Sequence, residues 1–487
     1  MACHLNTTIN TTLIVFVVIY LLATLGLGLW AGTRIKNSTD FAIAGRRLPL
    51  VMVITTTFAT WFGAETVMGI PAKFVQGGLN AIVEDPFGAG LCLVLVGLFF
   101  ATKLYGLNLL TIGDYYHLRY NRTVEVLCTI CIVISYLGWV SAQIIALGLV
   151  FDVLSGGLIP KHWGMIIGAA IVLTYTLSGG MLAVAFLDFV QMIVICCGML
   201  FIAYIVSGLA GGAGNVVAHA REAGKFNFFP PPDFRQWLWF VAAWMTMMLG
   251  SIPQQDVFQR MASSKNESIA CWGGVLGGCL YFCFAFLPMF LAYSATLIAP
   301  EMVKGFIDSE SQRILPNLIL NHTPMIAQIL FFGALLAAIM SCASATLLAP
   351  SVTFSENLLR PMFRNLSDRQ FLLMMRSVVL VFTCIVLANA IASNATIYQM
   401  VENAYKVTLV AAFVPLVFGL YWKGANSIGA MSAILGGLVT WITLEVTRTE
   451  TSLWPPQLAG LLVAVAGMVA GSLLAPRLGT LKTSHSV

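Results

Sequence analysis

The sequence is poor in charge. Of its 487 residues only 9% are charged, whereas 59% are hydrophobic, and soluble proteins carry about 25% charged residues. A chain with so little charge must place most of its surface against lipid or other apolar helices. The net charge of +5 is small, and membrane topology accounts for it without a nucleic-acid partner.

Other absences narrow the function. The sequence has no Walker nucleotide-binding motif, so uphill transport would have to draw its energy from an ion gradient or from the solute itself. It has no clustered nucleophile–base pair or metal-ligand set, which argues against an enzyme and against a bound cofactor. The 11 cysteines lack the spacing of a disulfide framework. The first apolar run has no basic region before it, so we expect a spanning helix there rather than a cleaved signal peptide.

Long apolar runs are what the chain has instead. A spanning helix needs about 20 mostly apolar residues, and thirteen runs meet that requirement. They predict an all-α membrane protein with a single transmembrane domain over residues 1–487. The runs lie near 11–32, 50–77, 82–102, 122–152, 162–178, 181–211, 235–257, 268–298, 323–358, 371–393, 397–422, 426–447 and 455–475.

Lysine and arginine are distributed unevenly between the predicted loops. If the loop 33–49 is cytoplasmic, 16 of these residues fall on its side and 7 on the other. Basic residues concentrate in cytoplasmic loops. We therefore expect a multi-pass protein of the plasma membrane, with the N-terminus outside and the C-terminus in the cytoplasm.

Two predicted spans carry helix-breaking residues near their middle. The second has Gly63, Gly69 and Pro71, and the seventh, five spans later, has Gly250 and Pro253. Interrupted helices in corresponding positions indicate an inverted repeat with a binding site at the breaks. Two kinks that serve only packing would leave the same pattern.

Ionisable residues inside predicted spans are candidates for function, because burying them in a membrane is unfavourable. Glu65 would bind a cationic group or pair with Lys73. Asp188 would lie on an ion pathway or merely complement the N-terminal dipole of its helix. Glu402 and Lys406 are four residues apart, so a simple intrahelical ion pair is expected.

The ninth span presents one face of small residues that includes Ala338, Ser341 and Cys342. Such a face allows close helix packing. It also offers a carbonyl and a hydroxyl to a hard cation.

Four segments of the chain form an ordered set: Asp40-Phe41 with Ala44-Gly45-Arg46, Ala59-Thr60-Trp61, Gly179-Gly180 with Asp188 and Gln191, and Ala338 to Ser341. Together they resemble the sodium/solute symporter family, over about 40–425. Members carry proline, sugars, sialic acid or choline, and the resemblance is greatest to the choline and proline branches. It implies a leucine-transporter-type core of two inverted five-helix repeats, 50–211 and 235–422, with one extra helix before and two after.

The resemblance also implies a sodium site between the second and ninth spans. Its matching positions are the carbonyls of Ala59, Phe62 and Ala338 and the side chain of Ser341. The remaining family hydroxyl falls on Cys342, and a thiol is a poor ligand for a hard cation. Sodium binding would then be weaker or recruit water.

Two residues bear on this departure. Ser344 is a substitute hydroxyl for the ion. Asp188 matches a family aspartate on the sodium exit path and is the natural proton carrier if the coupling ion has changed.

The substrate site is implied in the same way. Trp61 and Trp139 match two positions of the aromatic cage of the choline branch, whereas Gln254 stands where that cage has a tryptophan. Glu65 adds negative charge and favours a cationic or zwitterionic amine. Packing alone would also explain the two tryptophans.

Together these features predict a sodium-coupled secondary active symporter that imports a small organic solute by alternating access. Its partners would be the solute, Na⁺ and the lipid bilayer, with no obligate protein partner. The alternatives are a proton-coupled symporter of the same fold, a passive channel and a solute sensor.

Overall fold

The computed structural model describes residues 11–308, 310–363, 365–449 and 451–474, and these residues are overwhelmingly helical. Within them the only β-type pairing is an isolated bridge between Leu48 and Ser264. The bundle is built from α1 (Thr11–Gly32), α3 (Leu50–Trp61), α4 (Ile70–Gly77), α5 (Ala89–Leu95), α8 (Arg122–Leu154), α9 (Lys161–Leu209), α11 (Phe234–Gly250), α12 (Gln255–Ala262), α13 (Glu267–Ile298), α16 (Met325–Phe354), α17 (Asp368–Ala392), α18 (Ile397–Thr408), α19 (Val414–Tyr421), α20 (Ser427–Thr447) and α21 (Pro456–Leu474).

Shorter segments join or extend these helices. Five-to-six-residue π-helical segments continue several spans, and short α-helices lie in the connections. They are η2 (Glu65–Gly69), η4 (Val83–Gly88), η5 (Val96–Phe100), η7 (Ser355–Leu359), η9 (Leu409–Phe413), α2 (Ser38–Ile43), α6 (Ala101–Tyr105), α7 (Ile112–Arg119), α10 (Ala213–Glu222), α14 (Pro300–Phe306) and α15 (Ile314–His322).

Polar side chains mark where several spans begin. Asn121 and Asn266 accept hydrogen bonds from the first-turn amides of α8 and α13. Ser367 and Thr396 form capping boxes at the starts of α17 and α18. These caps satisfy amides that the helix leaves without partners, which explains why the spans start close to the predicted residues.

Ten helices within the described residues are long and apolar enough to cross a membrane, and the bent pair formed by α3 with η2 and α4 makes eleven. The structure therefore does not confirm the predicted count of thirteen membrane-spanning helices. The structure joins the predicted spans 162–178 and 181–211 into α9, and it ends the seventh span at Gly250. The two chain termini, which were predicted to lie on opposite sides of the membrane, fall outside the described residues.

The interior of α9 explains part of the difference in count. Gly180 has a left-handed φ of 47°, a conformation that side chains rarely adopt. Tyr175, before the kink, donates to the Met340 carbonyl at 2.8 Å, and Asp188, after it, accepts from Ser341 at 2.5 Å. Residues on both sides of Gly180 thus contact adjacent residues of α16, so the chain folds back at the glycine.

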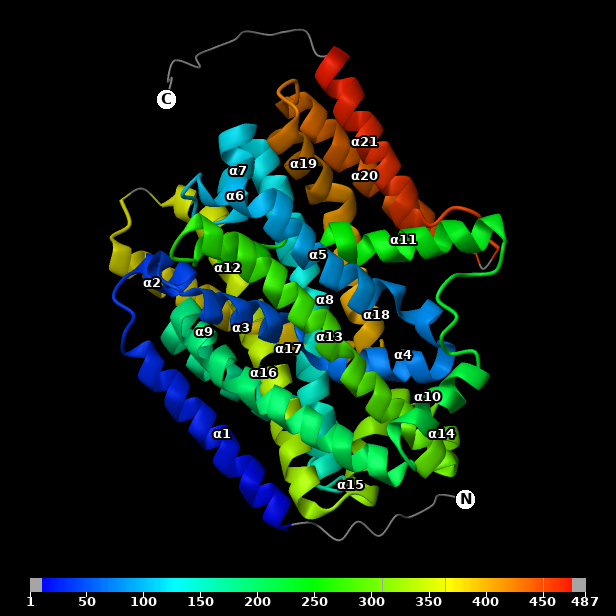
Figure 1. Cartoon of the computed structure of the whole chain (residues 1–487). Coiled ribbons are helices and arrows are strands. Elements are labelled where there is room, and N and C mark those ends of the chain that lie inside the picture. The colour runs from blue at the N-terminus through cyan, green and yellow to red at the C-terminus, as the bar shows by residue number, and fades with distance from the viewer. Residues whose placement is uncertain (1–10, 309, 364, 450, 475–487) are drawn as a thin grey trace.

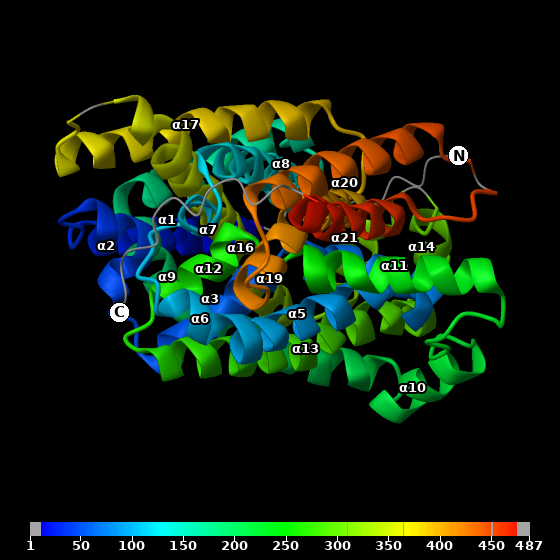
Figure 2. The same ribbon diagram turned by 90° about the horizontal axis from the view of Figure 1, so that it is seen from above.

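The helices form one elongated bundle (Figure 1). The first described helix, α1, starts at the lower edge of this view, and α21 ends at the upper edge. Seen from above, α8 and α17 lie on one side and α13 on the opposite side, with α3 and α16 between them (Figure 2). The residues of α16 from Phe331 to Leu348 are almost all buried, so α16 is the centre of the core.

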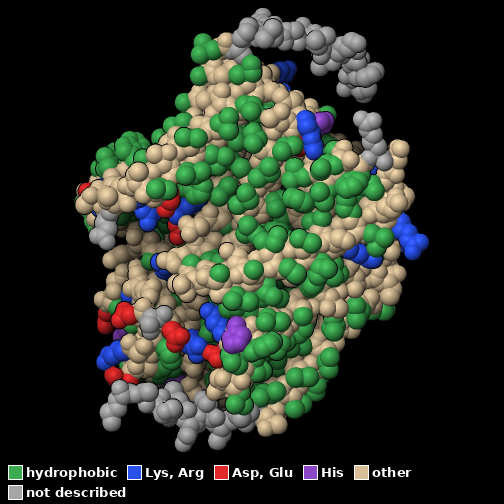
Figure 3. Space-filling view, turned by 180° about the vertical axis from the view of Figure 1, so that it is seen from behind, with side chains coloured by type: hydrophobic (Ala, Val, Ile, Leu, Met, Phe, Trp, Pro, Cys, Tyr) green, Lys and Arg blue, Asp and Glu red, His purple; other side chains and the backbone are tan. Residues whose placement is uncertain are grey.

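The outer surface is largely apolar. Hydrophobic side chains are spread over the whole face in Figure 3, and charged side chains gather there in a few small groups. Large apolar side chains such as Leu22, Leu380 and Val439 are about half exposed or more. Exposed apolar side chains on long apolar helices are suited to lipid rather than water.

Candidate functional site

The helix formed by α3 and η2 is broken beside Gly63, as the sequence predicts. Its two halves are bent by 53°, and Phe62 has the non-helical angles φ −84° and ψ 69°. The Gly63 amide donates to the Trp61 carbonyl at 3.0 Å instead of to Ala59, four residues back. The break therefore leaves the Ala59 carbonyl without the bond that a continuous helix would give it.

Close packing against α16 accounts for the glycine at this break. A Cβ atom on Gly63 would lie 2.8 Å from the Cys342 sulfur and 2.9 Å from the Gln143 side-chain oxygen. Neither approach is sterically allowed, because real Cβ atoms keep more than about 3 Å from such neighbours. Cys342 is thus placed directly against the broken backbone, on the side that α16 presents.

The Asp188 centre is a buried carboxylate bound by two hydroxyls. Ser341 donates to one oxygen and Thr56 to the other, each at 2.5 Å, and all three side chains are buried. The three residues come from α9, α16 and α3. Because a hydroxyl keeps lone pairs after donating its proton, this centre presents only oxygen to any neighbouring cation.

The predicted sodium residues fall into two groups in the structure. Ser341 joins the Asp188 centre, and Cys342 packs on the break that contains Phe62. Ala59, Phe62 and Ala338 are all fully buried, on the two facing helices α3 and α16. Carbonyls and hydroxyls in such a place are suited to Na⁺, for which oxygen is the preferred ligand.

Two further hydroxyl residues, Ser344 and Thr56, lie in or next to the Asp188 centre. Ser344 donates to the Ser341 carbonyl at 2.9 Å, within its own helix. Thr56 was not predicted, although its position one turn before Thr60 in α3 is visible in the sequence. A hydroxyl one turn before the Thr60-Trp61 segment was the available signal.

The Glu65 centre is a buried carboxylate bound by N–H groups. Trp139 donates its indole N–H to one oxygen at 3.0 Å, and Gln143 donates its amide to the other at 2.6 Å. The Gln143 oxygen in turn accepts the Ala64 amide at 2.9 Å. Glu65 lies in the first turn after the break, and α8 thus holds both the carboxylate and the free end of the second half-helix.

Four aromatic rings pack together next to this carboxylate, one of them, that of Trp139, bonded to it, and we call them the aromatic box. Trp61 lies 5.6 Å from Trp139 and 6.1 Å from Tyr405, and Trp139 lies 5.4 Å from Tyr405. Tyr281 lies 6.3 Å from Trp61 on the side of α13 and donates its hydroxyl to Asp85. The two tyrosines were missed because they lie far along the chain from Trp61.

Gln254 does not join the aromatic box. Its amide donates to Ser135 at 2.9 Å and to Thr408 at 3.4 Å. It lies at the second predicted break, between α11 and α12, which the structure confirms over residues 251–254. The side chain therefore belongs to the polar packing of that break.

Three cations of the broken spans and their neighbours have partners other than the two buried carboxylates. Lys73 lies 5.4 Å above the Tyr398 ring, so the alternative pairing with Glu65 is not formed. Glu402 and Lys406 form the expected ion pair at 2.7 Å. Arg260 donates to the Thr60 hydroxyl at 2.7 Å and to the Asp256 carbonyl at 3.0 Å.

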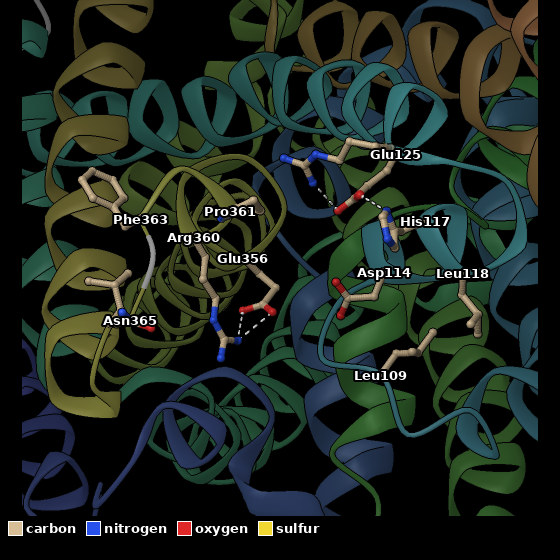
Figure 4. Close-up of a pocket in the computed structure, with 12 residues that line it drawn as sticks. Leu109, Asp114, His117, Leu118, Glu125, Glu356, Arg360, Pro361, Phe363 and Asn365 are labelled. Atoms are coloured by element: carbon tan, nitrogen blue, oxygen red, sulfur yellow. Dashed lines mark hydrogen bonds and ion pairs between the residues drawn. The ribbon is translucent and has the colours of Figure 1, made fainter.

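A cavity of about 660 Å³ opens away from both centres, at the end of the bundle that carries α7 (Figure 4). In its lining, His117 contacts Glu125 at 2.7 Å and Arg360 pairs with Glu356 at 2.8 Å. Asp114 instead accepts a hydrogen bond from Asn357 at 2.7 Å. Burial raises the pKa of the Asp114 carboxyl there. By contrast, the cavity that reaches Trp61 has only about 10 Å³, so the described conformation is closed at that side of the aromatic box.

The fold and the two broken helices define a secondary transporter, and the comparisons name its family. The model of the Sodium:solute symporter family matches residues 41–437, and the chain belongs to this family. It is 30% identical to the high affinity choline transporter 1 of Homo sapiens, covering 88% of this chain and 76% of that one. It is 28% identical to the high-affinity proline transporter PutP of Bacillus subtilis (strain 168), covering 85% and 88%.

A solved structure of a Na⁺-coupled sialic acid symporter has the same fold. The TM-score is 0.79 at 20% identity, covering 95% of this chain and 98% of that one. Family and fold together show that the chain is a sodium-coupled symporter that imports a solute. These relatives are named for transport rather than for an enzymatic reaction, and their solutes differ widely, so similarity alone does not name the solute.

Proposed function

We propose that the chain imports a small organic amine together with Na⁺, by alternating access through two inverted repeats, 50–211 and 235–422. The observation that carries the amine is the Glu65 centre, a buried carboxylate beside an aromatic box. A cation placed there gains both charge attraction and cation–π attraction. The choline and proline named in two relatives both carry a positively charged nitrogen.

The sodium ion is proposed to lie between the break of α3 and the facing turn of α16. The carbonyls of Ala59, Phe62 and Ala338 and the hydroxyl of Ser341 would hold it, with Cys342 beside them. Asp188 would attract the ion through Ser341 and give it a path to leave. The buried position of all these groups and the oxygen-only character of the Asp188 centre support this assignment.

The proposed topology has thirteen spans, with the α7 end in the cytoplasm of a plasma membrane and the N-terminus outside. The basic residues of the loops support this orientation. In it, the Glu65 centre lies on the outward side of the break and Asp188 on the inward side.

Uptake by proteoliposomes tests the function. The full chain is reconstituted, and a panel of amines, amino acids, sugars and carboxylates is presented with an inward Na⁺ gradient, a pH gradient or neither. We expect concentrative uptake of an amine only with the Na⁺ gradient. Uptake that depends on the pH gradient and not on Na⁺ would show that the coupling ion is a proton, which Asp188 would carry. Flux that never concentrates the solute would indicate a channel.

A further inference from the structure

We infer that the solute bears its positive charge on a nitrogen that carries at least one N–H, and that the site selects such an amine over a quaternary ammonium. This inference rests on the proposed function, because it assigns the chemistry of the solute at the same site. It goes further by separating this chain from relatives named for choline, whose nitrogen has no N–H to donate.

The first step is the charge balance around Glu65. The carboxylate is 2% exposed, and no Lys or Arg among the described residues is bonded to it. The nearby cations are engaged elsewhere, Lys73 with Tyr398, Lys406 with Glu402 and Arg260 with Thr60. A buried carboxylate without a cationic partner is unfavourable, so the solute is the natural source of the missing positive charge.

The second step is the count of hydrogen bonds. A carboxylate has about four lone-pair positions, and the side chains of Trp139 and Gln143 occupy two of them. The remaining positions need N–H or O–H donors. An ammonium with N–H groups supplies charge and donor together, whereas a quaternary ammonium supplies charge only.

The third step is the shape of the aromatic box. Neighbouring rings of the aromatic box lie 5.4–6.3 Å from one another, and the hydrogen bond from Trp139 holds the Glu65 carboxylate against them. Gln254, by contrast, is bonded to Ser135 and Thr408. A quaternary ammonium is recognised by rings on several sides. Here a carboxylate is bonded to one of the rings. The rings attract both kinds of ammonium, so the N–H group, which only the carboxylate can accept, distinguishes them.

A graded set of probes tests this directly. Ethanolamine, N-methylethanolamine, N,N-dimethylethanolamine and choline share one carbon skeleton and carry three, two, one and no N–H groups on the charged nitrogen. Their dissociation constants are measured by calorimetry on the full chain in saturating Na⁺. We expect the largest step between the dimethyl and trimethyl compounds, about 10- to 100-fold, because the last hydrogen bond to a charged acceptor is then lost.

The variant Glu65→Gln tests the cause of this step. It keeps the shape and removes the charge, so ethanolamine should bind at least about 10-fold more weakly and the step to choline should nearly vanish. Glu356→Gln is the control, since that carboxylate is bonded to Arg360 and its variant should retain the step. Near-ultraviolet circular dichroism confirms that each variant keeps its tertiary packing.

The outcomes separate the two proposals. Choline binding as tightly as the N–H compounds, absence of binding by all four, or a step that survives Glu65→Gln would each overturn the inference. Na⁺-driven uptake of another solute would still leave the proposed coupling intact in those cases. The predicted order of binding without any Na⁺-driven uptake would support the inference and refute the proposed mechanism of transport.

Discussion

The two buried carboxylates on either side of the α3 break have opposite surroundings. Asp188 is bound by the hydroxyls of Ser341 and Thr56, whereas Glu65 is bound by the N–H groups of Trp139 and Gln143. Hydroxyls keep lone pairs for a metal ion, but indole and amide N–H groups have none. The Asp188 centre therefore suits a bare cation that needs oxygen ligands, and the Glu65 centre suits an organic cation that brings its own donors.

This difference also explains how one broken helix can serve two cations. The break frees the Ala59 carbonyl at the end of α3, and the Asp188 centre joins α3 to α16 through its two hydroxyls. Glu65 begins the next half-helix, and its carboxylate is bonded to two side chains of α8. If the two cations bind as proposed, each would fix a different half of the same break, and this would give the two sites a physical route to coupling.

The largest effect is expected from Asp188→Asn, which removes the charge and keeps the shape. Because the neighbouring hydroxyls cannot replace a charge in a buried site, Na⁺-driven uptake should fall by about 100-fold or more. The measurement is the initial rate against Na⁺ concentration. Solute binding to Glu65 at very high Na⁺ should persist. Normal Na⁺ dependence in this variant would remove Asp188 from the ion pathway.

Trp139→Phe tests the other centre and should have the second largest effect. The variant retains an aromatic ring but loses the indole N–H that binds Glu65, so solute affinity should fall by about 10-fold. The half-saturating Na⁺ concentration measured at high solute should change little. Trp272→Phe, on an exposed ring of α13, is the control and should transport normally. An equal loss in both variants would point to general destabilisation.

Much of the fold could be predicted from the sequence, because apolar runs and caps are local signals. The eleventh span was expected at 397–422 and is observed as Ile397–Tyr421. Both helix breaks were found because glycine and proline reveal them without any tertiary information. The exact number of spans was harder to match, because Gly180 reverses the chain without interrupting the helical pattern on either side.

The candidate site could be predicted only in part. Glu65 and Asp188 stood out because a charge inside an apolar run is visible locally. Their partners were not visible, since Gln143, Tyr405 and Thr56 reach the two centres from other helices or other turns. The role of Gln254 in substrate binding stays a prediction, because a matching position in a family fixes the backbone but not where a different side chain finds hydrogen bonds.

Thr56→Val should have a smaller effect, confined to sodium. Valine retains the shape but cannot bind the Asp188 carboxylate, so the half-saturating Na⁺ concentration should rise by about 5-fold. Thr57→Val is a matched control, since Thr57 is buried next to it and its hydroxyl has no hydrogen-bond partner within the described residues. A similar rise in both variants would attribute the effect to packing of α3 rather than to Asp188.

Cys342→Ser should have the smallest effect and the opposite sign. A hydroxyl is a better ligand for Na⁺ than a thiol, and the side chain lies directly against the break at Gly63. The half-saturating Na⁺ concentration should therefore fall by about 2- to 5-fold, since one ligand of several is improved. Cys92→Ser is the control, because Cys92 is equally buried but lies in α5. Cys342→Ser could leave the half-saturating Na⁺ concentration unchanged while Thr56→Val raises it. The ion would then be held nearer to Asp188 than to the break. In that case the Asp188 centre by itself would be the ion site, and the Glu65 centre by itself the solute site.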